Sequence, residues 1–368
     1  MTPDPGLASW LQLTLTPGLG ASTIRNLLRQ FGLPESVIAR KRELAAYATP
    51  EALVALHSEA VRAQVDRALR WTDEPGHFIV TLADEFYPRA LLEIPDPPSL
   101  IYAHGRIDLL QRSCLAIVGS RNATAQGESN AASFAKALSN AGLTIVSGLA
   151  VGIDAAAHRG GLEGAGSTIA VLGTGIDVLY PKRNSELAGR IAAQGLLLSE
   201  FPLGTGPVAS NFPRRNRLIS GLAQGCLVIE AALASGSLIT ARTSAEQGRD
   251  VFAIPGSIHS PVSKGCHALI KSGAKLVESA EDVLAELSAF RGSGHASNTG
   301  GEALLEANSA AGLLAHMGHD PVDVDSLCAR AGMSAEQVAS ELLRLELEGA
   351  VAALPGGLYQ RLAKRQSG

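Results

Sequence analysis

The stretch CLAIVGSRNAT, residues 114–124, joins a short apolar run to a turn of small residues and then to a helical pattern. Six further apolar runs with similar endings follow it. They are TIVSG (144–148), STIAVLGTG (167–175), LLLSEF (196–201), CLVIEA (226–231), DVFAIPG (250–256) and AKLVES (274–279). Short apolar runs that alternate with amphipathic segments are typical of repeated βα units. The sequence therefore predicts an α/β fold with a doubly wound, mainly parallel sheet.

Ligands of doubly wound sheets bind beyond the carboxyl ends of the strands. The residues expected at this edge are Ser120, Ser147, Gly175 and Gly256. In the first turn, Gly119 would let the backbone approach a phosphate and Arg121 would add charge. An ordinary tight turn with a surface arginine is the alternative. The chain has no GxGxxG fingerprint after this strand and no P-loop, so a dinucleotide or P-loop nucleotide is not supported.

The stretch FPRRNRLISG, residues 212–221, places three arginines around one asparagine, just before an apolar run that suggests a helix start. These residues are Arg214, Arg215, Asn216 and Arg217. Backbone N–H groups at a helix start favour an anion, and guanidinium groups match phosphate oxygens. In a chain with a formal net charge of -4 this cluster is a local feature. A solvated charged turn is the alternative.

Two later segments carry small hydroxyl or basic residues near helix starts. Gly236, Ser237 and Thr240 lie in ASGSLITARTS, where they could contact phosphate or cap the helix. Lys264 precedes a glycine in SKGCHALIKSGA and is a further phosphate candidate, with a solvated lysine as the alternative. Cations that converge along one edge, without a compact nucleotide pocket, favour an extended polyanion.

Asp154 and His158, in SGLAVGIDAAAHRGG, are four residues apart and would share one face of a helix. This spacing could suit a metal or an acid/base pair. With no third ligand nearby, a helix cap and a structural histidine are favoured, and no metal is assigned. The chain also lacks a nuclease-like carboxylate cluster, a GxSxG elbow and a Cys/His nucleophile pair. These absences favour a binding protein without cofactor over an enzyme.

The four cysteines of the 368 residues show no CxxC spacing, which favours reduced, buried thiols and a cytoplasmic protein. The N-terminus has no basic leader pattern, and no apolar run approaches the length of a membrane span. We therefore expect no membrane association.

The chain divides into four parts by composition. Residues 1–75 are a helical module whose LTPGLGASTIRNLLRQFG resembles a helix-hairpin-helix or SAM-like element, although a plain helical turn is the alternative. Residues 76–290 form the sheet domain, of which 76–111 are an extended, proline-containing approach segment that should pack on it. Residues 291–305 read as a flexible linker. Residues 306–368 have the element order of a winged helix-turn-helix domain.

The expected recognition helix of this last domain is acidic. It carries Glu336, Glu341, Glu346 and Glu348 against Arg344. A helix that reads duplex DNA usually offsets phosphate repulsion with basic residues. A protein contact or a structural role is therefore favoured.

The motifs AIVGSR, SGLAVGIDAAAHRG, FPRRNRLISG, SGSLITARTSAEQGRDVFAIPG and KGCHALIKSGA occur in this order. Together with IPDPPSLIY, the helical front module and the terminal LLRLELEGAV and PGGLYQR, they closely resemble the DNA-processing protein A (DprA/Smf) family. The resemblance implies an extended Rossmann-like domain that binds single-stranded DNA. It also implies a homodimer that protects incoming strands and helps load the RecA recombinase during natural transformation. Dimerisation through the edge of the sheet domain is expected on the same ground.

The resemblance also assigns DNA contacts. It places Gly119, Ser120 and Arg121 at the DNA backbone, with Ser147 and Gly148 beside them, and Arg215, Asn216 and Arg217 match the family's RNR motif. Phe212 stands where a ring could stack on a base, with a core position as the alternative. Many family members have a lysine shortly before this phenylalanine, where the chain reads PVASNF, and Arg214 is expected to substitute. Gly265-Cys266-His267 replaces the family's GxN pattern.

Two other functions remain as alternatives. One is an enzyme similar to the nucleoside-monophosphate phosphoribohydrolases, but ASGSLITARTSAE lacks the paired glycines of their motif. The other is a winged-helix transcription regulator, which the acidic recognition helix disfavours. The single-strand hypothesis predicts that Arg121→Ala or Arg217→Ala weakens binding and reduces its salt dependence by about 0.7 per lost phosphate contact.

Overall fold

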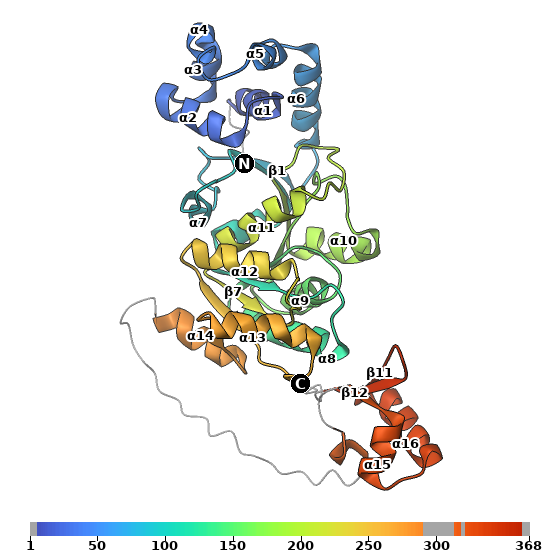
Figure 1. The fold of residues 1–368 in the computed structure, drawn as a ribbon. Helices are drawn as coiled ribbons and strands as arrows, with labels where there is room; N and C mark the ends of the chain where they lie inside the picture. The colour runs from blue at the N-terminus through green and yellow to red at the C-terminus, as the bar shows by residue number, and fades with distance from the viewer. Residues whose placement is uncertain (1–5, 290–312, 318–320, 363–368) are drawn as a thin grey trace.

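The computed structural model describes residues 6–289, 313–317 and 321–362, so the expected linker at 291–305 lies outside the described residues. A nine-stranded sheet forms its centre (Figure 1). The seven apolar runs all form strands, which confirms the predicted sheet. They are β3 (Cys114–Val118), β4 (Thr144–Ser147), β5 (Thr168–Val171), β6 (Leu196–Ser199), β7 (Gly225–Val228), β8 (Asp250–Ala253) and β9 (Lys275–Leu276).

The strand order is β1-β2-β6-β5-β4-β3-β7-β8-β9, and β3 to β9 pair in parallel. The chain winds outward from β3 in both directions, so the strand order reverses between β3 and β7. The approach segment contributes β1 (His77–Thr81) and β2 (Leu100–Gly105), which pair antiparallel with each other. β2 also pairs antiparallel with β6, so the approach segment is part of the sheet.

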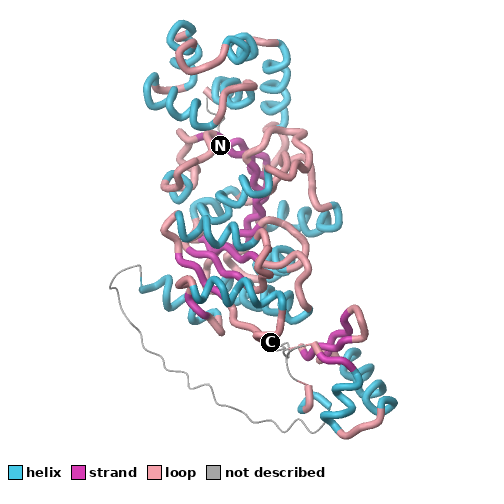
Figure 2. Tube along the Cα trace, in the orientation of Figure 1, coloured by secondary structure: helices cyan, strands magenta, loops and turns pink. Residues whose placement is uncertain are grey.

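Helices cover both faces of the sheet (Figure 2). One face packs against α8 (Ala125–Asn140), α9 (Ile153–Leu162), α10 (Ser185–Gln194) and α14 (Ala280–Ala289). The other packs against α7 (Arg89–Leu92), α11 (Asn211–Leu222), α12 (Ser237–Glu246) and α13 (Lys264–Lys271). Gly160 lets α9 approach α8, since a Cβ at Gly160 would lie 2.1 Å from the Ala132 carbonyl oxygen. The sheet is therefore covered by a helical layer on each face.

The N-terminal helices form a module beside β1 (Figure 1). They are α1 (Leu7–Leu15), α2 (Ala21–Phe31), α3 (Pro34–Ala39), α4 (Lys41–Leu44), α5 (Pro50–Leu56) and α6 (Glu59–Trp71). Their own core includes Leu13, Ile24, Leu27 and Leu56. α1 and α6 also pack against the sheet domain through Trp10 and other apolar residues. The module is therefore a helical unit with a core of its own that also rests on the sheet.

The C-terminal unit has the winged-helix order that the sequence predicts. It contains β10 (Val322–Asp323), α15 (Val324–Ala331), α16 (Ala335–Leu347), β11 (Val351–Leu354) and β12 (Leu358–Arg361). Ser334 and Gln337 form a capping box that fixes the start of α16. Arg344 pairs with Glu341 and Glu348 on the same helix. The basic residue expected on this helix is therefore engaged by its acidic neighbours.

The described part of the chain also contains four short 3-10 helices, at Ile107–Gln111, Lys182–Asn184, Pro261–Ser263 and Leu313–Ala315. Across the same residues, none of the helices combines the length and the apolar character that a bilayer crossing requires.

Candidate nucleic-acid interface

A groove of about 750 Å³ lies beyond the carboxyl ends of β3 and β7, where the strand order reverses. This is the place where doubly wound sheets bind ligands. The groove brings together predicted residues that are up to 121 positions apart. These are Gly119, Ser120, Arg121, Phe212, Arg215, Asn216, Gly236, Ser237 and Thr240. Ser147, Gly148, Arg214, Arg217 and Lys264 are not among the residues that line it.

The turn after β3 is fixed by Glu230, which lies two residues after the end of β7. The Glu230 carbonyl accepts the Ser120 N–H at 2.8 Å, and its carboxylate accepts the Thr124 N–H at 3.0 Å and the Thr124 hydroxyl at 2.6 Å. Between these anchors Arg121 is exposed, and it makes no ion pair with any residue that the structure describes. Its guanidinium lies 6.0 Å from the centre of the Phe212 ring. Arg121 is therefore a cation available to a ligand in the groove.

Phe212 forms part of the groove wall. Its ring packs over Gly173, where a Cβ would lie 2.8 Å from the ring, and lies 5.7 Å from the Tyr180 ring, centre to centre. The Phe212 side chain is half-buried. Its exposure lies between that of a ring free to stack on a base and that of a core residue, the two alternatives that the sequence left open. An aromatic ring held on one side and accessible from the groove can offer a surface to a base.

The start of α12 lies on the opposite wall. Gly236 is the N-cap residue of α12 and has no side chain that could cap the helix. The Ser237 hydroxyl bonds the Ser235 hydroxyl at 2.7 Å. Thr240 is buried below them. The first N–H groups of this helix already have acceptors: the Ser237 N–H donates to the Ser235 hydroxyl at 3.3 Å, and the Leu238 and Ile239 N–H groups donate to the Ser235 and Gly236 carbonyls, both at 3.1 Å. What this end offers an anion is the positive end of the helix dipole.

The arginine run does not precede a helix, because α11 begins at Asn211 and the arginines lie within it. Successive residues of a helix point about 100° apart, so Arg215 points away from Arg214 and Arg217, which are three residues apart and lie close together on the helix. Arg215 is only 4% exposed and donates to the Gly148 carbonyl at 2.6 Å and to the Val171 carbonyl. Its charge is balanced by buried Asp154. Burial raises the pKa of Asp154, and Arg215 opposes that rise.

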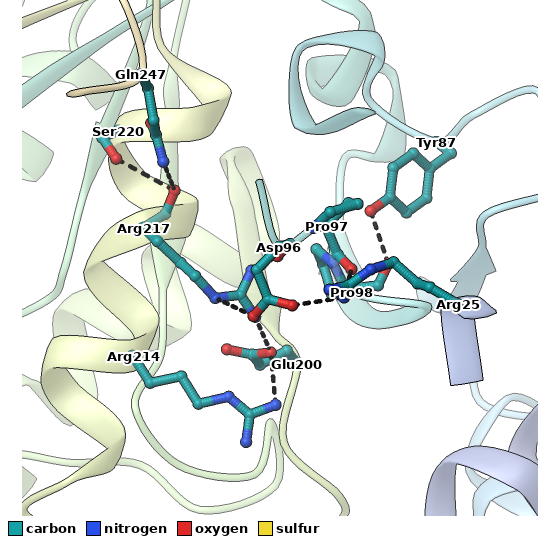
Figure 3. Close-up of polar contacts among 10 residues, drawn as sticks. All are labelled: Arg25, Tyr87, Asp96, Pro97, Pro98, Glu200, Arg214, Arg217, Ser220 and Gln247. Atoms are coloured by element: carbon teal, nitrogen blue, oxygen red, sulfur yellow. Dashed lines mark hydrogen bonds and ion pairs between the residues drawn. The ribbon is translucent and has the colours of Figure 1, made fainter. Parts of the chain in front are cut away.

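Arg214 and Arg217 instead point toward Glu200 and Asp96, on the side of α11 where Arg25 of the N-terminal module lies (Figure 3). Both pair with the buried carboxylate of Glu200, Arg214 at 3.1 Å. Arg217 also pairs with Asp96 at 3.4 Å, and Arg25 of α2 pairs with the same Asp96 carboxylate at 2.5 Å. Burial raises the pKa of Glu200 above its ordinary value, against the lowering effects of Arg217 and Arg214. This chain of charges links the N-terminal module to the arginine helix.

Three predicted contacts are engaged elsewhere. The Ser147 hydroxyl is fully buried and donates to the Ile117 carbonyl at 2.7 Å. Gly148 accepts from Arg215 beneath the groove. Lys264 is exposed, and its ammonium group donates to the Ile258 carbonyl. Their contacts with DNA remain predictions.

Asp154 and His158 lie on α9, and both are hydrogen-bonded within the protein. In the described part of the chain, no group of three or more His, Cys, Asp or Glu side chains could hold a metal ion. Sequence reasoning did not single out Asp96, Glu200 or Glu230. Glu200 and Glu230 each come directly after the apolar part of a strand run. An acidic residue at the carboxyl end of a strand was the sequence signal that could have identified them.

Comparisons with known proteins identify the family of the chain. Residues 78–288 match the family described as DNA recombination-mediator protein A, and residues 305–357 match the DprA winged helix domain. Protein Smf of Escherichia coli is 44% identical over 312 residues, which cover 82% of each chain. DNA processing protein DprA of Streptococcus pneumoniae is 51% identical over 206 residues, 56% of this chain and 73% of that protein.

Two solved structures are also similar. DprA from Streptococcus pneumoniae has a TM-score of 0.61 at 40% identity and covers 75% of this chain and 95% of its own. DNA processing protein A from Helicobacter pylori, whose structure concerns its single-stranded DNA binding mode, has a TM-score of 0.53 at 29% identity. It covers 58% of this chain and 96% of its own.

Proposed function

The chain belongs to the DNA recombination-mediator protein A family, and from this premise we propose that it binds single-stranded DNA in the groove at the β3/β7 switch point during DNA uptake and natural transformation. The observation that carries the proposal is the convergence of an available arginine, an aromatic ring and the positive end of a helix in one groove. These are Arg121, Phe212 and the N-terminus of α12. The Helicobacter pylori relative, described by its single-stranded DNA binding mode, supports the same ligand.

The groove suits a single strand better than a duplex. Single-strand binders combine a cationic groove that follows the backbone with a ring on which an unpaired base can stack. A paired base inside a duplex could not reach Phe212, which is half-buried in the wall. The direct contacts in this proposal come from Gly119, Ser120, Arg121, Phe212, Asn216, Gly236, Ser237 and Thr240. Arg215 supports the groove from below.

We also propose that the protein acts by binding and not by catalysis. The titratable groove residues Asp154 and Arg215 are committed to hydrogen bonds within the protein, which leaves neither as a general acid or base. Protection of incoming strands, loading of the RecA recombinase and a cytoplasmic location complete the proposal. The family's description as a recombination mediator supports the recombinase partner. A homodimer is proposed as well, and a monomer mass in light scattering at micromolar concentration would contradict it.

The salt dependence of binding tests the groove directly. For the full chain, filter retention should show tighter binding of a single-stranded oligonucleotide than of its duplex. Arg121→Ala should weaken binding and reduce the slope of log K against log salt by about 0.7, the value for one phosphate contact on a single strand. Arg190→Ala is the matched control, because Arg190 is an exposed arginine on α10 outside the groove. An unchanged affinity and slope in Arg121→Ala would contradict the proposal.

A further inference from the structure

The turn at residues 148–152, between β4 and α9, supports the groove from below. Ala150 and Asp154 contribute to the groove lining. Leu149 has a φ of 57°, in the left-handed region that residues other than glycine rarely adopt. Such a conformation persists only where the surroundings hold it in place.

Buried side chains bind all the backbone polar groups from Gly148 to Ala150. Asp154 accepts the Gly148 N–H at 3.1 Å and the Ala150 N–H at 3.4 Å, and Arg215 donates to the Gly148 carbonyl. Asn184 donates to the Leu149 carbonyl at 2.9 Å and to the Ala150 carbonyl at 3.2 Å. The remaining group, the Leu149 N–H, donates to His158 Nε2 at 3.3 Å. A turn so completely bonded has one strongly preferred conformation.

The tautomer of His158 follows from its partners. The Thr168 hydroxyl donates to the Ile145 carbonyl at 2.7 Å, so its oxygen is left to accept from His158 Nδ1–H at 2.7 Å. Nε2 then carries the lone pair that the Leu149 N–H requires. Burial lowers the pKa of His158 to about 3, which keeps the ring neutral at physiological pH.

The turn is also in contact with the DNA-facing turn after β3. The Ile153 N–H donates to the Ser120 carbonyl at 3.2 Å. A Cβ at Gly152 would lie 2.4 Å from the same oxygen, and a Cβ at Gly119 would lie 2.6 Å from the Ile153 side chain. There is no free space between the two turns. A movement of residues 148–152 would therefore displace Ser120 and Arg121.

We propose that His158, Asn184 and Asp154 are positioning residues that hold the 148–152 turn, and through it the Ser120–Arg121 turn, in the geometry that receives DNA. The inference rests on the proposed function. A preorganised groove loses less conformational entropy on binding, so His158 and Asn184, which do not line the groove, contribute to affinity without touching the strand. Asp154 also balances the charge of Arg215, so His158 and Asn184 are the cleaner residues to test.

The test compares three full-chain variants in the salt-series retention experiment. His158→Leu removes both the acceptor and the donor and should weaken single-strand binding about tenfold, because the Leu149 N–H loses its partner and the turn its preferred conformation. The slope against salt should stay at the wild-type value, since no phosphate contact is lost. His158→Gln keeps one acceptor and one donor and should retain most of the affinity. Asn184→Ala removes the donor to the Leu149 and Ala150 carbonyls, and it should weaken single-strand binding to a similar extent.

Val283→Ala controls for stability alone. Val283 is a fully buried residue of α14 and is not part of the turn, so its truncation should lower the melting temperature and leave binding unchanged. Amide exchange at residues 148–150 gives a reading that does not depend on DNA, with protection in the wild type that is lost in His158→Leu.

Wild-type affinity in both His158→Leu and Asn184→Ala would overturn the inference. A reduced salt slope would also overturn it, because it would show direct phosphate contact. If the wild type bound no single strand, the proposed function would fail by itself. Exchange protection would then decide separately whether these side chains hold the turn.

Discussion

Replacement of Arg215 by Met is expected to lower the free energy of unfolding of the sheet domain by about 3–5 kcal/mol and to abolish retention of single-stranded DNA. Arg215 and Asp154 are buried charges of opposite sign that influence each other without a direct ion pair. Removing one of two such charges leaves the other uncompensated, and this is the usual cost. Here the remaining charge is Asp154, which is 7% exposed. The Gly148 and Val171 carbonyls would also lose their donor. The loss of DNA binding follows because Arg215 lies beneath the groove and holds the turn after β4.

Thermal unfolding followed by circular dichroism measures this effect, and a shift on the order of 10 °C corresponds to it for a domain of this size. Arg214→Met is the matched control, since Arg214 neighbours Arg215 in sequence but its side chain is 50% exposed. It should change the melting temperature little. Adding Asp154→Asn to Arg215→Met should recover part of the stability, because the unpaired buried charge is removed. A melting temperature for Arg215→Met equal to that of Arg214→Met would refute the buried-pair interpretation.

The sheet was predictable because its signal is local. Each of the seven parallel strands is an apolar run that ends in small residues, and burial on both faces makes such runs nearly continuous. The two antiparallel strands of the approach segment were not predicted. HFIVT and LIYAHG lie among prolines and polar turns, and their pairing depends on β6, about a hundred residues later in the sequence. No periodicity within either segment specifies that partner.

The groove was predictable only in part, for a related reason. Gly119, Ser120 and Arg121 follow a strand directly, so the sheet alone places them at the edge. The arginines of α11 could be counted in the sequence, but not their directions. Whether each one faces DNA depends on Asp96, Asp154 and Glu200, which come from three other segments. Of the three arginines, Arg215 is therefore buried beneath the groove, and Arg214 and Arg217 are bound in ion pairs.

Arg217→Met should lower the free energy of unfolding by about 2 kcal/mol at neutral pH, less than Arg215→Met because Arg214 still pairs with Glu200. The sequence predicted a DNA-binding effect for Arg217. In the structure its guanidinium is bound by Glu200 and Asp96, so stability is the expected first readout (Figure 3). The Asp96 carboxylate also holds Arg25 of α2, so the variant should additionally loosen the N-terminal module.

The pH dependence of this variant follows from Glu200. Its pKa is already raised in the folded protein, and loss of Arg217 removes a lowering influence and raises it further. A carboxyl group with a raised folded pKa favours the folded state below its unfolded pKa, and this contribution is lost as pH rises through the folded value. The deficit of Arg217→Met relative to the wild type should therefore be largest near pH 7 and shrink toward pH 5. In a Glu200→Gln background the same substitution should cost nearly the same at both pH values. A deficit that grew on acidification would show that Glu200 is not the charge left without its partner.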